Sequence, residues 1–370
     1  MLSRSTSRSL GLLGVLALLG AGCAPATPES EGTQSVTQKG QVCTRGCGST
    51  DEPNGRGIHI ARTEPQSQYG MHNSDGSFKF WLTHFESSGG KVQAAGWFID
   101  GSGTAVKALS TTIAASYQGR PAALLNMTSQ GSQLVVTLRD TTGIVFTLLD
   151  KENVGLELNF SLANPDRRIA HDFQITVDSL DAISSLTGDV SGYTLRYADR
   201  SLGDKPRELC QNALTGPESN VFFGGASWHP IHSGRVDNPG HLTVTCQSGA
   251  VAVCMGWGYR PWAKAYNSLT SQDESLLDTH QACIQMKRAA YCGDAQAFTI
   301  EGTKIAIQDS FQPAFNSEFS GDIEAVWGPK GASCVTTPRH DPATYFASAC
   351  AQTLPQCPAG AVGTLISSNP

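Results

Sequence analysis

Residues that could bind a ligand are concentrated in the run Met255-Gly-Trp257-Gly-Tyr259-Arg260-Pro-Trp262. Glycines beside large rings remove side-chain cover, and such surfaces stack on sugar or other planar faces or anchor protein partners. Trp257, Tyr259, Arg260 and Trp262 are therefore the candidate ligand-binding residues. The alternative is that Trp257 and Trp262 fill the core beneath a helix, because a small disulfide-stabilised domain needs bulky core residues.

Cysteine is the second residue type that could do chemistry, and the chain has 11 of them. If Cys23 is set aside, ten remain, an even number that can all pair in an oxidising compartment. The Cys43 and Cys47 spacing favours a small closed loop, and Cys350 and Cys357 are close enough to bond each other. The complete set of disulfide candidates is Cys43, Cys47, Cys210, Cys246, Cys254, Cys283, Cys292, Cys334, Cys350 and Cys357.

A β-hairpin is predicted to carry two of these cysteines. Apolar residues alternate over 242–246 and again over 250–255, on either side of Gln247-Ser248-Gly249, which is the pattern of two strands joined by a tight turn. In that register Cys246 and Cys254 point to opposite faces of the hairpin. We therefore expect that they do not bond each other.

A helix is predicted to follow, with Ser271 as its N-cap and Glu274 completing a capping box. Gly293 lies just beyond its expected end. Along this helix Cys283 and Cys292 would be separated by roughly 13 Å, about twice the largest Cα separation that a disulfide tolerates. Each must then bond a cysteine elsewhere. If Cys350 bonds Cys357, six cysteines remain between Cys210 and Cys334, and the two exclusions leave ten of their fifteen pairings open.

The run HQACIQMKRAAYCGDAQAFTIEGTKIAIQD, with CMGWGYRPW before it and AVWGPKGASCV after it, resembles the ADYC domain of bacterial lipoproteins. The resemblance covers several spaced motifs from about Cys210 to Cys334. The domain is named for an Ala-Asp-Tyr-Cys string, and here Ala290 stands where the family has Asp. The resemblance implies a fold and a cellular context, but no activity and no catalytic residue.

The N-terminus has the pattern of an export signal. Arg4 and Arg8 precede an apolar run over 10–19, and Gly20-Ala21-Gly22 leads into Cys23. The apolar run is too short for a comfortable transmembrane helix, and small residues before a cysteine are typical of a lipoprotein signal. We expect residues 1–22 to be removed and Cys23 to be lipidated, with cleavage after Ala26 to a soluble exported protein as the alternative.

The remaining chain is expected to be mainly β, with α+β character in its C-terminal half. Residues 23–57 are rich in Pro, Ser, Thr and Gly and predict a flexible tether. Residues 58–200 predict an antiparallel β-sandwich or barrel-like domain. Residues 201–357 predict the disulfide-stapled, ADYC-like domain of β-hairpin and helix, and 358–370 a tail. The predicted strands of the first domain are 78–85, 92–99, 112–117, 122–127, 133–138, 144–149, 155–161, 171–177 and 193–197.

Charge and motifs limit the functions to consider. The net charge is −6, and it becomes −8 when the signal leaves with its two arginines, which excludes nucleic acid as the expected partner. No pattern predicts a cofactor or a metal site. We expect a non-enzymatic binding or scaffolding protein of the cell envelope, anchored at the outer membrane through lipid on Cys23, with an envelope glycan or protein as its partner. The alternative is an envelope hydrolase whose site lies between the two domains and draws on Asp294, Glu301, Asp309, His280 and His340.

Overall fold

A large antiparallel sheet dominates the computed structural model, which describes residues 71–72, 79–99, 105–163, 170–183, 190–212, 216–228, 234–293, 298, 305–316, 322–339 and 350–368. The hydrogen-bonded order is β4-β3-β2-β16-β15-β11-β10-β9-β5-β6-β7-β8, with β1 beside β2 and β12 beside β11. Its strands are β1 (Met71–His72), β2 (Lys79–Ser88), β3 (Lys91–Ile99), β4 (Ala105–Leu109), β5 (Ala114–Tyr117), β6 (Arg120–Gln130), β7 (Gln133–Asp140), β8 (Val145–Leu149), β9 (Leu156–Ala163), β10 (Ala170–Ile183), β11 (Val190–Asp199), β12 (Arg207–Glu208), β15 (Asn220–Trp228) and β16 (Arg235–Cys246).

Each of the nine strands predicted between residues 78 and 197 is present, because alternation of apolar and polar residues is strong wherever one sheet face is buried. The strand β7 shows this alternation, with every second residue from Leu134 to Leu138 buried. The short strand β4 was missed. The prediction of a mainly β, antiparallel fold is confirmed.

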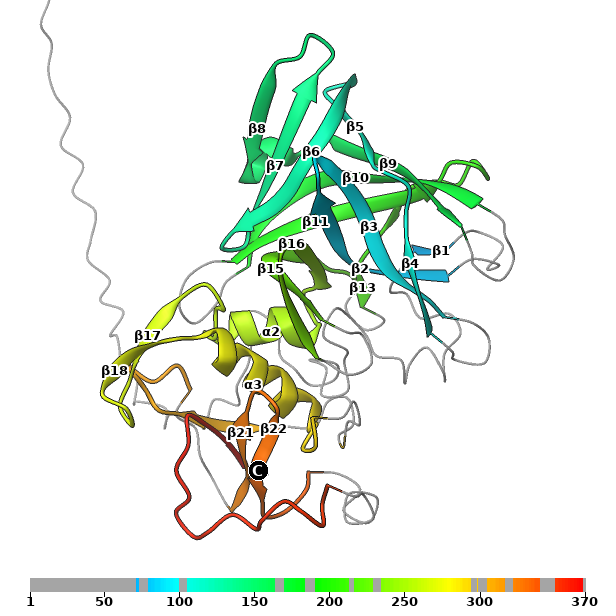
Figure 1. Ribbon diagram of the computed structural model, residues 1–370. Coiled ribbons are helices and arrows are strands. Elements are labelled where there is room, and N and C mark those ends of the chain that lie inside the picture. The colour runs from blue at the N-terminus through cyan, green and yellow to red at the C-terminus, as the bar shows by residue number, and fades with distance from the viewer. Residues whose placement is uncertain are drawn as a thin grey trace, which may run out of the picture. The chain divides into compact units, whose positions relative to one another are not determined.

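The sheet curves so that strands far apart in its order face each other across the first hydrophobic core (Figure 1). Ser87 of β2 exchanges hydrogen bonds with the backbone of Met127 in β6, at 3.1 and 3.2 Å. The backbone N–H of Gly224 in β15 donates to Ser129 Oγ at 2.7 Å. These contacts attach the β6–β7 hairpin to β2 and β15, which places its turn close to the C-terminal half of the chain.

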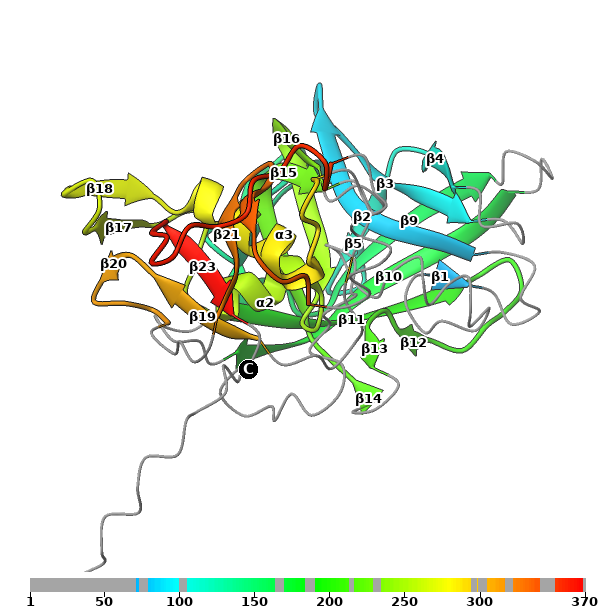
Figure 2. The same ribbon diagram turned by 90° about the horizontal axis from the view of Figure 1, so that it is seen from below.

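Two helices lie between the large sheet and a smaller one (Figures 1 and 2). Helix α2 (Ala250–Gly256) contacts β16 and helix α3 (Leu277–Arg288), and α3 contacts the four-stranded sheet β19-β23-β21-β22. The remaining strands are β13 (Gln211–Asn212), β14 (Gly216–Pro217), β17 (Lys264–Asn267), β18 (Gln272–Ser275), β19 (Ala306–Asp309), β20 (Phe311–Gln312), β21 (Ile323–Gly328), β22 (Gly331–Val335) and β23 (Leu365–Ser368), and η1 (Asp150–Asn153) is a 3₁₀ turn. No helix of the described ranges is both long and apolar enough to span a bilayer.

The predicted hairpin over 242–255 is wrong in its second half, because residues 250–256 form the helix α2. At Leu242 and Thr243 the strand β16 is already paired on one edge with β15 and on the other with β2. A second hairpin strand running back from the turn at Ser248 could therefore not extend along β16 as far as Thr243. All seven residues of α2 are buried, so its backbone must be satisfied internally, which a helix does and a lone strand does not.

The predicted start of the next helix is also wrong, because α3 begins at Leu277 and not after Ser271. Ser271 has a left-handed backbone conformation, with φ of 58°, in the turn between β17 and β18. The carboxylate of Glu274 accepts hydrogen bonds from Thr270 Oγ1 at 2.6 Å and from Asn267 Nδ2 at 2.8 Å. Ser271 and Glu274 therefore have the sequence spacing of a capping box, but in the structure they belong to the β17–β18 hairpin loop, which the hydrogen bonds of Glu274 stabilise.

Four disulfides join Cys210 to Cys246, Cys254 to Cys283, Cys292 to Cys350 and Cys334 to Cys357. Both exclusions are therefore confirmed, but the predicted Cys350–Cys357 bond is wrong. Cys350 packs with the core around the two helices, whereas Cys357 packs with Cys334 in a separate small cluster. Cys23, Cys43 and Cys47 lie outside the described residues. The strands β15 and β16 continue the large sheet past residue 200, and the domain boundary expected there stays a prediction.

Candidate ligand-binding pocket

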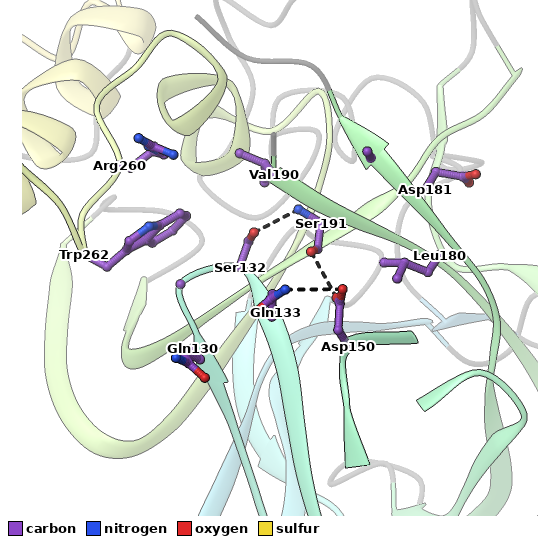
Figure 3. A pocket seen from close by; sticks show the side chains of 12 residues that line it. Gln130, Ser132, Gln133, Asp150, Leu180, Asp181, Val190, Ser191, Arg260 and Trp262 are labelled. Atoms are coloured by element: carbon purple, nitrogen blue, oxygen red, sulfur yellow. Dashed lines mark hydrogen bonds between the residues drawn. The ribbon is translucent and has the colours of Figure 1, made fainter. Parts of the chain in front are cut away.

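A pocket of about 450 Å³ opens where the β6–β7 turn, the facing ends of β10 and β11, and the segment after α2 meet. Gln130 and Asp181 lie at its exposed edge, and Ser132 and Val190 are buried at its inner wall. Figure 3 shows Arg260 and Trp262 on one side, with Asp150 and Gln133 facing them from the other. Two of the four residues predicted from the aromatic run therefore line a pocket together.

The other two candidate residues, Trp257 and Tyr259, are buried and do not line the pocket. The Tyr259 hydroxyl donates to Asp309 Oδ2 at 3.0 Å and accepts from Asn316 Nδ2 at 2.9 Å. Gly258 between the two rings has φ of 103°, a conformation that residues with a side chain rarely adopt. The rings hold this segment in the core, and it then emerges at Arg260 and Trp262.

The position of Trp262 depends on the absence of a side chain at Gly131. A Cβ on Gly131 would lie 3.2 Å from Trp262 Nε1, and Gly131 has φ of 63° in the turn between β6 and β7. On another side the indole of Trp262 lies 6.1 Å from the ring of Phe223, measured between centroids. Trp262 is only half-buried, so part of its ring stays open to the pocket.

Asp150 forms the opposite wall and is held by three side chains. Its Oδ1 accepts from the Tyr193 hydroxyl at 2.6 Å and from Ser191 Oγ at 3.0 Å, and its Oδ2 accepts from Gln133 Nε2 at 3.4 Å. Asp150 has φ of 51°, which Asp tolerates better than most residues. Burial, and then the hydrogen bond to Asp150, raises the pKa of the Tyr193 phenol above its ordinary value, so Tyr193 stays a donor.

The arrangement has the chemistry of a binding site. Arg260 Nε is buried and has no hydrogen-bond partner among the described residues. The Ser132 hydroxyl accepts from the Ser191 backbone N–H at 2.8 Å, and the Ser191 hydroxyl donates to Asp150 (Figure 3). No histidine is among the described residues that line the pocket, so neither serine is paired there with an imidazole base.

Of the five residues considered for a hydrolytic site, the two that the structure describes, His280 and Asp309, belong to separate hydrogen-bond networks. Asp294, Glu301 and His340 lie outside the described residues. His280 Nε2 donates to the carbonyl of Val251 at 2.9 Å, and Asp309 accepts from Tyr259 in a separate buried network. Ser132, Gln133 and Asp150 were missed, because nothing in the sequence connects a turn at residue 131 with a tryptophan at 262.

The fold and the disulfides together define a β-rich, disulfide-stabilised protein, and four disulfides fit an exported one. A family model, the ADYC domain, matches residues 150–341. The chain therefore belongs to the ADYC domain family, as its motifs predicted. Comparison with curated proteins and with solved structures found no match. The family match covers Asp150, Arg260 and Trp262, whereas the β6–β7 turn at residues 130–133, which also lines the pocket, lies outside it.

Proposed function

We propose that this chain is a lipid-anchored binding protein of the cell envelope, and that its pocket binds an acidic sugar of an envelope glycan. The observation that carries the proposal is the half-buried Trp262 ring, held against Gly131 and facing the planar polar groups of Gln130, Gln133 and Asp150. Sugars are bound by aromatic rings that stack on their apolar face and by planar side chains that bond their hydroxyls.

Arg260 supports a ligand that carries a carboxylate. Its guanidinium lines the same pocket as Trp262, and its Nε lacks a partner among the described residues. A buried donor without a partner is costly, and a ligand carboxylate would satisfy it with a charge-assisted hydrogen bond. The carboxylate of Asp150 is already satisfied by Tyr193, Ser191 and Gln133, so its acceptor groups do not compete for Arg260.

The envelope location is supported by sequence and by disulfide chemistry. The predicted export signal covers residues 1–22 and ends just before Cys23, and the eight described cysteines of the C-terminal half are all bonded. An acylated Cys23 would attach the chain to a membrane through lipid, and the tether predicted over 23–57 would separate the folded part from the surface. The intact mass of the membrane-extracted protein tests this part. A diacyl or triacyl mass that disappears in Cys23→Ser supports it, and an unmodified Cys23 contradicts it.

The pocket is tested by titrating the full chain with an oligosaccharide of hexuronic acids and with the matched neutral oligosaccharide. We expect the acidic sugar to bind more tightly, and Trp262→Ala to weaken its binding by about fivefold or more, since one buried aromatic contact is worth more than about 1 kcal/mol. Arg260→Gln should remove the preference for the acidic sugar while retaining weak binding of both. Tyr266→Ala is the control, because Tyr266 is an exposed ring that does not line the pocket. Equal binding of both sugars, or binding unaffected by Trp262→Ala, would contradict the proposal.

A further inference from the structure

A second cluster of polar side chains lies on the strands β2 and β16, away from the pocket. Glu86 of β2 is the register partner of His241 in β16, and His84 precedes Glu86 by two residues on the same face of β2. His84 Nε2 lies 3.1 Å from Glu86 Oε1, and His241 Nε2 lies 3.9 Å from the same oxygen. The three potential ligand atoms all lie within 4.8 Å of one another.

Both imidazole rings are oriented by hydroxyl groups behind them. Thr83 Oγ1 lies 2.9 Å from His84 Nδ1, and Ser227 Oγ lies 2.9 Å from His241 Nδ1. Each ring therefore directs its Nε2 toward Glu86. Metal-binding histidines have this arrangement, in which the distal ring nitrogen is hydrogen-bonded and the other nitrogen binds the metal. The ring centroids of His84 and His241 are only 4.4 Å apart, which brings two nitrogen ligands to one point.

Irregularities in the strands produce this placement. The pairing of β2 with β3 shifts between Leu82 and His84, so Thr83 is an extra residue in β2. A similar shift at Gly224 and Ala226 precedes Ser227 in β15. Such bulges redirect side chains and occur often beside functional sites. They place the two hydroxyls behind the two rings.

The site is protected but open on one side. His84 and His241 are 5% and 9% exposed, whereas the Glu86 side chain is 23% exposed. On the open side Asn238 Nδ2 lies 3.1 Å from His241 Nε2, and Lys107 Nζ lies 3.3 Å from Glu86 Oε1. The Lys107 side chain is 52% exposed, so its ammonium can move into solvent and leave the carboxylate to another cation.

We propose that His84, Glu86 and His241 form a binding site for a divalent transition metal, with Zn²⁺ as the best match. Two imidazoles and one carboxylate are a ligand set used by Zn²⁺ and by Fe²⁺. In a tetrahedral site with bonds of about 2.1 Å, the ligand atoms lie about 3.4 Å apart. The observed 3.1 and 3.9 Å bracket this separation. Three protein ligands leave a fourth position for water or a bound molecule.

The competing interpretation is a hydrogen-bonded network in which Lys107 alone neutralises Glu86. The two differ in what Lys107 does. In a metal site its ammonium competes with the metal for Glu86 Oε1, so removing it strengthens metal binding. In a network without a metal its removal leaves the affinity for Zn²⁺ unchanged.

The test is calorimetric titration of the chelator-treated, full-length protein with Zn²⁺, and Co²⁺ as a spectroscopic probe. We expect about one ion per chain and Co²⁺ absorption bands of a four- or five-coordinate site. Glu86→Gln and His84→Gln should each weaken Zn²⁺ binding more than about tenfold, and Lys107→Ala should strengthen it by about fivefold. Glu86→Gln keeps the shape of the side chain, so it reports on ligation even if a histidine variant folds poorly.

Two control variants separate ligation from general effects. Lys151→Ala removes the same charge from an exposed position on η1 and should leave Zn²⁺ binding unchanged. His171→Gln alters the histidine that bonds Asp199 Oδ2 at 2.7 Å on other strands, and it should also leave binding unchanged. The proposal is overturned if the wild-type chain binds no Zn²⁺, if Glu86→Gln binds like the wild type, or if Lys107→Ala fails to increase the affinity.

Discussion

The phenol of Tyr291 donates a hydrogen bond to Glu324 Oε1 at 2.5 Å, which ties a residue three positions after the end of α3 to the strand β21. Glu324 Oε2 also lies 2.9 Å from Arg339 Nη2, and both side chains of this ion pair are almost completely buried. Arg339 in turn donates to the carbonyl of Met286, near the C-terminal end of α3, at 3.1 Å. Tyr291 belongs to the string that corresponds to the family's Ala-Asp-Tyr-Cys. In this chain Tyr291 is buried within this network, and Ala290 beside it is buried and uncharged.

Removing the charge of Glu324 should destabilise the protein strongly. Glu324→Gln leaves Arg339 buried without a counter-ion, and breaking a buried pair in this way costs about 3 to 5 kcal/mol of unfolding free energy. Urea unfolding monitored by tryptophan fluorescence measures the change. The control is Asp178→Asn, which breaks the exposed pair with Arg196 and should cost less than about 1 kcal/mol. Equal losses of unfolding free energy in the two variants would show that the buried Glu324–Arg339 pair contributes no more to stability than an exposed pair.

A side chain at Gly131 should weaken the pocket. Gly131→Ala must adopt an unfavourable φ of 63°, and its new Cβ would press against Trp262. Gly119→Ala is the matched control, since Gly119 also lies in a hairpin turn with φ of 73° but has no atom within 4 Å of an added Cβ. We expect both variants to lose about 1 kcal/mol of stability, and only Gly131→Ala to shift the emission of Trp262 and weaken binding of an acidic sugar. Similar binding by the two variants would contradict the importance of this contact.

The Cys254–Cys283 disulfide should stabilise the packing of α2 on α3. It joins the two helices with a sequence separation of 29. Replacing both cysteines by alanine removes the bond without leaving a free thiol, and we expect a loss of about 2 to 4 kcal/mol in unfolding free energy. Chemical denaturation measures it, and peptide mapping without reductant should still find Cys292 joined to Cys350 and Cys334 joined to Cys357. Exchange of those partners in the variant would show that the bond guides the other pairings.

Acid should destabilise the protein through His280 before most carboxylates titrate. Burial lowers the pKa of His280 from 6.5 to about 4, and no hydrogen-bond partner of Nδ1 is found among the described residues. Between these two values the unfolded chain binds the proton and the folded chain does not. Stability therefore falls as the pH decreases from about 6.5 toward about 4, by up to about 3 kcal/mol from this residue. His280→Gln should flatten the pH dependence of unfolding free energy between pH 6.5 and about 4.5. An unchanged slope would mean that His280 is protonated in the folded protein.

Local patterns predicted the strands but not every element between them. Apolar and polar residues alternate over 78–197 because one face of each strand is buried, and this alternation can be recognised from neighbouring residues alone. The segment 250–256 is apolar on all sides, so its sequence is compatible with a strand or a helix. In the folded protein this segment is a helix, because Leu242 and Thr243 of β16 are already paired on both edges and a second hairpin strand could not extend that far. The Ser271 and Glu274 pair was misleading for a related reason, because the same polar groups that cap a helix also stabilise the β17–β18 turn.

By itself, the sequence determined that this is a β-rich, ADYC-type chain whose cysteines form disulfides, and it identified Arg260 and Trp262 as residues to examine. Alternation, motif spacing and the number of cysteines are local or additive properties, and they need no coordinates. Only the tertiary structure decided which cysteine bonds which, that Trp262 lies against Gly131, and that His241 lies opposite Glu86. These relationships join positions from 23 to more than 150 residues apart, and such contacts depend on how the sheet curves and which strand edges remain free.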